Sequence, residues 1–221
     1  MMQPITITDP RVENYLYAVL PARHAVLQEM EARAKDEHIP IVGPAVARLL
    51  MQYAWLIEAR NIFEMGSAIG YSTIWWAMAV GDSGKVHYTD GSEKNAKDAR
   101  EYFERAGVAS QIEVHVGDAL ELFDARHEKF DIVFCDVDKH DYPRAARMAA
   151  ARVRKGGLFI TDNTLWKGKV AYLAGNPKLK PDPTDADTNA VAELNRMLYG
   201  SPDWYTTIIP LRDGVTVALR L

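Results

Sequence analysis

The chain contains one cysteine, no internal repeat and no long apolar run, and each absence excludes a class of protein. Because Cys135 is the sole cysteine among 221 residues, no disulfide can form within the chain, which favours a reducing compartment. No apolar stretch approaches membrane-spanning length, and the N-terminal residues lack the basic and apolar regions of an export signal. We therefore expect a cytoplasmic protein without a membrane partner.

A strong net charge is also missing. The 26 Lys and Arg residues face 30 Asp and Glu residues, which gives a formal net charge of -4. Such a chain has no global basic field to attract nucleic acid, although local basic patches remain possible. Nucleic acid is therefore not the expected partner, and a hydrophobic content of 48% is typical of a soluble globular domain.

Helix-like and strand-like segments alternate along the chain. Helical periodicity dominates residues 1–60, and from residue 61 onward short apolar runs are separated by segments of helix length. The expected parallel strands are 61–65, 85–89, 111–116, 130–135 and 157–161. This pattern predicts a single α/β domain over 1–221, with N-terminal helices followed by a core that has helices on both faces of a parallel sheet.

The C-terminal pattern differs from the rest. Residues 204–209 and 215–221 flank a turn with Asp213 and Gly214, which predicts an antiparallel hairpin. A helix is expected from Asp187 or Thr188 to Gly200 before it.

Two other helices have clear end signals. Ser92 is a candidate N-cap and Gly107 a candidate terminator of one helix. A second is expected from Pro143 to Arg154, capped by Asp141 and terminated by the glycines at 156–157.

A glycine-containing turn follows the first expected strand. Gly66 and Gly70 lie between that strand and an apolar helix, so backbone amides there can face an anionic group. Their spacing lacks the closely spaced glycine pair of dinucleotide-binding turns, which argues against a pyrophosphate ligand. Asp90, at the end of the next strand, can accept hydrogen bonds from ribose hydroxyls, and a ligand ammonium can neutralise Glu64.

Each of these residues also has a purely structural interpretation. The glycines can simply form a tight turn, Asp90 can cap the next helix, and Glu64 can face outward or pair with an arginine. Their occurrence on consecutive strand ends favours a binding site.

Oxygen-bearing side chains end two later strands. Asp136 follows the fourth strand, and Asp162 and Asn163 follow the fifth, at the sheet edge where ligands bind in open α/β folds. Carboxylate and amide oxygens suit Mg²⁺, and no His or Cys cluster indicates zinc. Lys139 follows Asp136 closely enough to serve as a general base near the metal. The alternative is a turn at Asp162 and Asn163 and a solvated lysine.

Several segments together resemble the cation-dependent O-methyltransferase family, which includes catechol and caffeoyl-coenzyme A O-methyltransferases. The matching segments, in order, are FEMGSAIGYS, YTDGSE, VGDALEL, FDIVFCDVDK, GGLFITDNTLWKGKV and PLRDGVTVAL. The resemblance implies a Rossmann-like, seven-stranded methyltransferase fold whose last strand is antiparallel. It also implies a homodimer formed through the N-terminal helices.

The family resemblance assigns roles to the same residues. S-adenosylmethionine (SAM) is the implied methyl donor, and Mg²⁺, Mn²⁺ or Ca²⁺ the implied metal. Asp136, Asp162 and Asn163 are the implied metal ligands, and Lys139 the catalytic base. The implied SAM-binding residues are Val42, Glu64, Gly66, Ser67, Ser72, Asp90, Ala119 and Asp136.

Two departures concern the acceptor. Gly91 follows Asp90 where relatives often have a branched apolar residue, and Val137 stands where catechol enzymes have a histidine. These changes do not affect the cofactor or metal chemistry, but they weaken the case for a catecholamine.

The leading hypothesis is methyl transfer to a hydroxyl of a phenolic small molecule with vicinal oxygens. An alternative is methylation of a hydroxyuridine in tRNA, which is suggested by two local basic clusters. These clusters are Arg144, Arg147, Arg152, Arg154 and Lys155, and Lys167, Lys169, Lys178 and Lys180. A non-catalytic SAM sensor and a nicotinamide-dependent dehydrogenase are further alternatives, which the metal pair and the glycine spacing disfavour.

Overall fold

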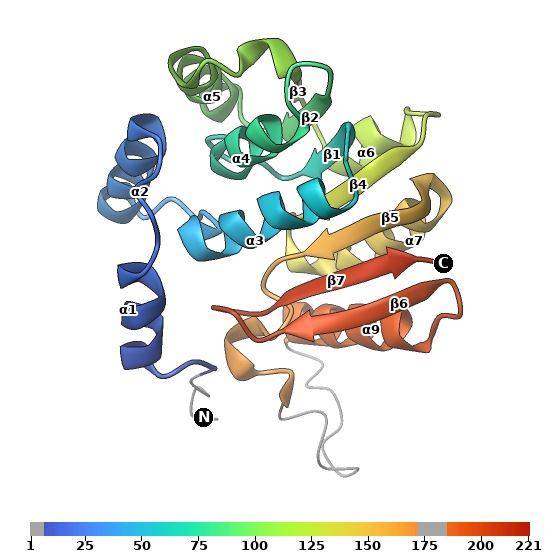
Figure 1. The fold of residues 1–221 in the computed structure, drawn as a ribbon. Coiled ribbons are helices and arrows are strands. Elements are labelled where there is room, and N and C mark those ends of the chain that lie inside the picture. The colour runs from blue at the N-terminus through green and yellow to red at the C-terminus, as the bar shows by residue number, and fades with distance from the viewer. Residues whose placement is uncertain (1–6, 172–184) are drawn as a thin grey trace.

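The computed structural model describes residues 7–171 and 185–221. Its centre is a seven-stranded sheet with the order β3-β2-β1-β4-β5-β7-β6 (Figure 1). The strands are β1 (Asn61–Met65), β2 (Lys85–Asp90), β3 (Ile112–Val116), β4 (Phe130–Cys135), β5 (Val153–Thr161), β6 (Trp204–Ile209) and β7 (Val215–Arg220). Strands β1 to β5 pair in parallel, and β7 pairs antiparallel with both β5 and β6. The predicted α/β fold with an antiparallel C-terminal hairpin is confirmed.

Helices cover both faces of this sheet (Figure 1). The α-helices are α1 (Pro10–Ala18), α2 (Ala25–Glu37), α3 (Gly43–Leu56), α4 (Tyr71–Val80), α5 (Glu93–Ala106), α6 (Ala119–Asp124), α7 (Tyr142–Arg152) and α9 (Ala186–Gly200). Successive strand residues face opposite sides, so Ile62 packs in the core that includes α3, α4 and α5, and Phe63 packs in the core beneath α6, α7 and α9. Both faces of the central strands are therefore buried, as their continuous apolar runs predict.

For two of the three helices with predicted ends, the structure agrees to within a residue or two. The Ser92 side chain accepts a hydrogen bond from the Asn95 amide at the start of α5, and Gly107 ends that helix in a left-handed conformation. Helix α9 ends at Gly200, as predicted, and begins one residue before Asp187.

The predicted end of α7 is wrong. The helix stops at Arg152, and Gly156 and Gly157 lie inside β5. Val153 pairs with Phe130 of β4, so tertiary pairing begins the strand earlier than the glycines suggest. A Cβ on Gly157 would lie 2.7 Å from the Asp131 carbonyl oxygen, so this glycine permits close strand approach and does not end a helix. The side chain of Asp141 makes no capping hydrogen bond to α7.

Helix α1 contributes nothing to either core. Its large apolar side chains Val12 and Tyr15 are exposed, as is Val19 immediately after it. Helices α2 and α3, in contrast, bury Leu27 and Leu50. No helix in the described ranges, 7–171 and 185–221, is long and apolar enough to cross a membrane.

The strand order places a crevice above the middle of the sheet. The chain passes from β1 outward to β3 and then returns to β4 on the other side of β1, so β1 and β4 are neighbours at a topological switch point. Ligands of open α/β sheets bind at the carboxyl ends of the strands at such a point.

Candidate active site

A cleft of about 1370 Å³ lies at the carboxyl ends of the central strands. Gly66, Asp90, Asp136 and Asp162 line it, and these residues lie at or just after the ends of β1, β2, β4 and β5. Its volume exceeds the roughly 300–1,000 Å³ of a typical single-ligand pocket, so the cleft has room for two small molecules side by side.

The glycine turn after β1 packs directly against the loop after β4. Gly66 has a φ of +82°, and a Cβ there would lie 2.6 Å from the Asp136 carbonyl oxygen. Any side chain at this position would separate the two loops, since backbone is the obstacle. The Gly66 amide donates to Thr89 Oγ1 at 3.3 Å, and the Ser67 amide donates to the Thr89 carbonyl at 2.9 Å. Both hydrogen bonds thus fix the turn to β2.

Glu64 is a fully buried carboxylate beneath this turn. Its Oε2 atom accepts a hydrogen bond from Thr73, and its Oε1 atom has no hydrogen-bond partner among the described residues. Burial raises the pKa of Glu64 to about 7, against smaller opposing effects of Ser72, Thr73 and Ser67. A buried carboxyl with an unsatisfied oxygen is suited to receive a cationic ligand group.

Asp90 lies in the cleft at the end of β2. Its Oδ2 atom accepts from the Ala68 amide at 3.0 Å, and its Oδ1 atom accepts from the Ser92 amide at 2.8 Å and from Asn95 Nδ2 at 3.1 Å. Ser92, not Asp90, caps α5, and the Asp90 carboxylate instead joins the glycine turn to the start of that helix. A carboxylate has about four acceptor positions, so capacity for a ligand hydroxyl remains.

The other predicted cofactor residues occupy two kinds of position. Ala119 lines the cleft at the start of α6. Ser67, Ser72 and Val42 are buried and are not part of its lining. Ser67 and Ser72 lie close enough to Glu64 to affect its pKa. These positions leave the assigned roles in SAM binding as predictions.

The three predicted metal ligands meet at one end of the cleft. Asp136, Asp162 and Asn163 all line it. Burial raises the pKa of both aspartates, and the charge of Asp136 raises the pKa of Asp162 further. Two carboxylates that repel each other, Asp162 buried and Asp136 partly exposed, form with an amide oxygen a donor set that fits a hard divalent cation.

Lys139 reaches the same group of residues from the short 3-10 helix η2 (Lys139–Asp141). Its Nζ atom lies 3.0 Å from Asp136 Oδ1 and donates a hydrogen bond to the Tyr142 hydroxyl at 2.6 Å. Only 11% of the Lys139 side chain is exposed, and its Nζ atom is 5.7 Å from the ring centroid of Trp166. The structure thus brings the predicted base and the predicted metal ligands together.

Two further residues, the buried Tyr142 and the cleft residue Arg212, were assigned no role from the sequence. The Tyr142 hydroxyl donates to the Asp162 carbonyl at 2.9 Å and so connects the loops after β4 and β5. Arg212 lies between β6 and β7, lines the cleft, and donates to the carbonyl oxygens of Ile41 and Val42. Arg212 lies in the segment PLRDGVTVAL, but its hydrogen bonds to Ile41 and Val42, like that of Tyr142 to Asp162, join residues far apart in the chain.

Comparison with known proteins shows the family of the chain. An O-methyltransferase family model matches residues 19–221. Caffeoyl-CoA O-methyltransferase of Petroselinum crispum is 36% identical over 172 residues, covering 75% of this chain and 70% of that protein. Caffeoyl-CoA O-methyltransferase 1 of Eucalyptus globulus is 33% identical and covers 100% of this chain and 91% of its own length.

Solved structures give the same result. The O-methyltransferase TomG from Streptomyces achromogenes, involved in tomaymycin synthesis and in complex with SAM, has a TM-score of 0.83 at 30% identity, covering 95% of this chain and 96% of that chain. The O-methyltransferase from Bacillus cereus, in complex with SAH, has a TM-score of 0.82 at 28% identity, covering 96% and 97%.

The fold and the cleft define a SAM-dependent methyltransferase. The chain belongs to the O-methyltransferase family, and its relatives include caffeoyl-CoA O-methyltransferases.

Proposed function

We propose that the protein transfers a methyl group from SAM to a hydroxyl of an aromatic small molecule with vicinal oxygens, and that the transfer requires a divalent cation such as Mg²⁺. The observation that carries this proposal is the convergence of Asp136, Asp162, Asn163 and Lys139 at one end of the cleft. The same cleft contains the glycine turn and Asp90, so donor and acceptor have adjacent places.

The residues of the cleft have separable tasks in this reaction. When bound, the cation supplies Lewis acidity, which lowers the pKa of an acceptor hydroxyl. Lys139, as the neutral amine, is positioned to receive the hydroxyl proton, and Asp136 and Tyr142 are placed to hold the ammonium that results. The indole of Trp166 lines the cleft beside Lys139 and offers a face for an aromatic acceptor. Most of the acceleration then comes from orienting two bound molecules.

An acceptor screen with labelled SAM tests the proposal. Caffeoyl-CoA, catechol and a matched monophenol are compared with and without Mg²⁺, with bulk tRNA as a further acceptor. We expect methylation of the vicinal diols in the presence of Mg²⁺ and much less of the monophenol. Methylation of tRNA alone, with a steep decrease at high salt, would show that the acceptor class is wrong.

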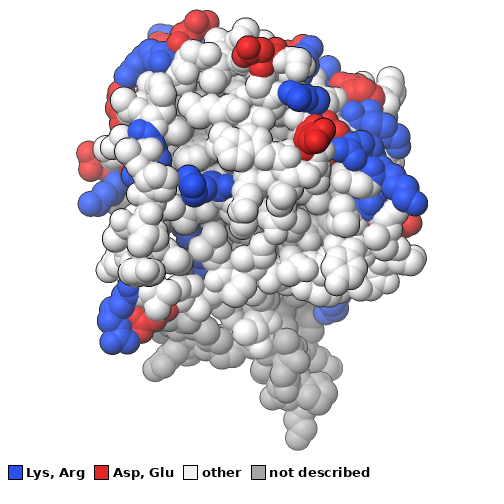
Figure 2. All heavy atoms as spheres, in the orientation of Figure 1, with Lys and Arg blue, Asp and Glu red and all other residues white. Residues whose placement is uncertain are grey.

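The surface gives little support to the tRNA alternative. On the face in Figure 2 the charged side chains lie mainly at the margins, and acidic and basic residues are interspersed. Of the two basic clusters, Arg147 pairs with Glu193, Arg154 with Asp131, and Lys169 with Asp185. Lys178 and Lys180 lie outside the described residues.

The homodimer stays a prediction. It is supported by the exposed apolar side chains of Val12, Tyr15 and Val19 in and after α1.

We predict that Glu64 binds the SAM ammonium. Glu64→Gln removes one partner of a buried charge pair, which costs about 2–5 kcal/mol and corresponds to a loss of SAM affinity of roughly 30-fold or more. Isothermal calorimetry measures this loss, and Glu104→Gln on the exposed face of α5 is the matched control. If Glu64→Gln bound SAM as tightly as the wild type, Glu64 would not be the residue that binds the SAM ammonium.

The pKa of Glu64 also predicts a pH dependence. Burial raises this pKa from 4.5 to about 7. Between these two pH values the ligand-free folded protein keeps a proton on Glu64 that the unfolded chain has lost. The stability contributed by that proton is full below pH 4.5 and is lost as the pH rises through 7. Only the ionised carboxylate pairs with an ammonium, so SAM affinity should fall by up to about tenfold per pH unit below 7. The same slope in Glu64→Gln, measured by calorimetry between pH 5.5 and 8, would assign the effect to another group.

A further inference from the structure

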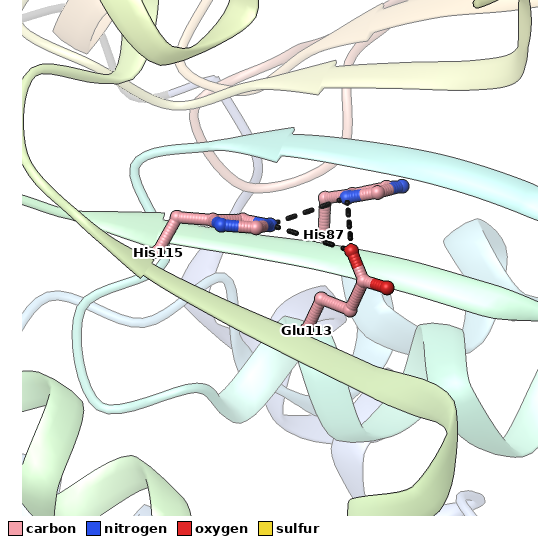
Figure 3. Close-up of side chains that lie close together, drawn as sticks. All are labelled: His87, Glu113 and His115. Atoms are coloured by element: carbon pink, nitrogen blue, oxygen red, sulfur yellow. Dashed lines mark hydrogen bonds and ion pairs between the residues drawn. The ribbon is translucent and has the colours of Figure 1, made fainter.

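A second group of metal-ligating side chains lies outside the cleft. His87 is on β2, and Glu113 and His115 are on β3 (Figure 3). His87 pairs in register with Glu113, and residues two apart on a strand face the same side of a sheet. The pairing therefore brings all three side chains onto one face at the edge of the sheet.

The three donor atoms already have the separations of a metal site. His87 Nδ1 is 3.3 Å from His115 Nε2 and 3.4 Å from Glu113 Oε2, and the last two atoms are 3.8 Å apart. Around a tetrahedral ion with bonds of about 2.0–2.1 Å, neighbouring donor atoms lie roughly 3.3–3.5 Å apart. An ion at the centre of this triangle thus requires only small side-chain rotations.

The side chains are also in the chemical state that a metal requires. Glu113 Oε1 accepts a hydrogen bond from the Lys85 ammonium, so Oε2 is the oxygen that faces the imidazoles. Burial lowers the pKa of His87 to about 4 and also lowers the pKa of His115. Both shifts favour the neutral imidazole, the form in which histidine binds a metal.

Nearby cations oppose a bound ion, and Arg126 is the most direct of them. Its Nη2 atom lies 3.1 Å from His115 Nε2, within hydrogen-bonding distance of the nitrogen that would bind the ion. Its side chain is 28% exposed, and its Nη1 atom lies 3.8 Å from Glu128, so the guanidinium has an alternative partner. Arg126 and Lys85 are therefore expected to reduce the affinity without excluding the ion.

We propose that His87, Glu113 and His115 form a zinc site distinct from the oxygen-lined site in the cleft. Two imidazoles and one carboxylate suit a borderline-soft ion such as Zn²⁺ better than Mg²⁺, and three protein ligands leave a fourth position for water. Such an ion joins edge strand β3 to β2, the strand that ends at the cleft residue Asp90. The sequence does not indicate this site because its ligands come from two strands, 26 residues apart from His87 to Glu113.

Metal titration of the whole protein tests the proposal. Co²⁺ is added in the presence of excess Mg²⁺, its visible absorption is followed, and Zn²⁺ is then used to displace it. We expect one equivalent with the intense bands of a four-coordinate ion and a rise in Tm with Zn²⁺. His115→Gln should weaken binding at least tenfold, since the loss of even a supporting group around a ligand costs about 10–100-fold.

Matched variants separate this site from adventitious binding. His127→Gln, an exposed histidine outside the cluster, should bind Co²⁺ as the wild type does. Arg126→Gln should bind several-fold more tightly, because it removes the opposing cation. Glu113→Gln, on a partly exposed side chain, should reproduce the loss if His115→Gln does not fold. Equal binding by wild type and both ligand variants would overturn the proposal.

Discussion

Replacing Asp162 with asparagine is expected to lower kcat/KM for methyl transfer by about 10³-fold, since Lewis-acid catalysis contributes several kcal/mol and each 1.4 kcal/mol is a factor of ten. The substitution retains the shape and one oxygen of the side chain but removes a carboxylate charge. Tyr142 bonds the backbone carbonyl of Asp162, so the loop keeps its support.

Steady-state kinetics with the best acceptor from the screen measure the effect of Asp162→Asn. Asp124→Asn makes the same chemical change at an exposed position at the end of α6 and should behave as wild type. Activity within a fewfold of wild type, at ordinary Mg²⁺ concentrations, would mean that Asp162 is not a metal ligand. The variant should also need more Mg²⁺ for half-maximal activity.

Replacing Lys139 with methionine is expected to reduce kcat by about 10²- to 10⁴-fold, the usual contribution of a general base. Methionine keeps an unbranched side chain in a position where only 11% of the lysine is exposed, so packing changes little. SAM affinity should change little, because Lys139 is not one of the implied SAM-binding residues and contacts only one of them, Asp136.

The assay of Lys139→Met needs two readouts. Rapid-mixing or steady-state kinetics give kcat, and calorimetry gives the affinity for SAM. Lys97→Met, on an exposed face of α5, controls for the loss of a positive charge. A variant that retains wild-type kcat would exclude Lys139 as the base, and one that loses SAM binding would make it a cofactor-binding residue instead.

The sheet could be predicted because its strands carry their own signal. The runs from Asn61 and from Phe130 are mainly apolar, and β1 and β4 are buried on both faces. The end of α7 could not be predicted from the local sequence. Gly157 is needed because a side chain there would collide with the Asp131 carbonyl of the neighbouring strand β4. A glycine in the sequence indicates that another part of the backbone lies close by or that φ is unusual. It does not indicate which helix or strand lies close to it.

The site was predictable where its residues follow strands, and not where they act across the fold. Asp136 and Asp162 end consecutive strands, so topology alone places them together. Tyr142 joins the site by a hydrogen bond to a carbonyl 20 residues away, and Arg212 by hydrogen bonds about 170 residues distant along the chain. Spacing in the sequence carries no information about such contacts.

The metal itself provides the most direct test of the central claim, that this family member transfers methyl groups with the help of a divalent cation. The protein is treated with EDTA, freed of chelator, and assayed with labelled SAM and a vicinal diol before and after Mg²⁺ is restored. We predict that transfer falls to roughly a hundredth or less and returns with Mg²⁺. Undiminished transfer by the metal-free protein would contradict the account.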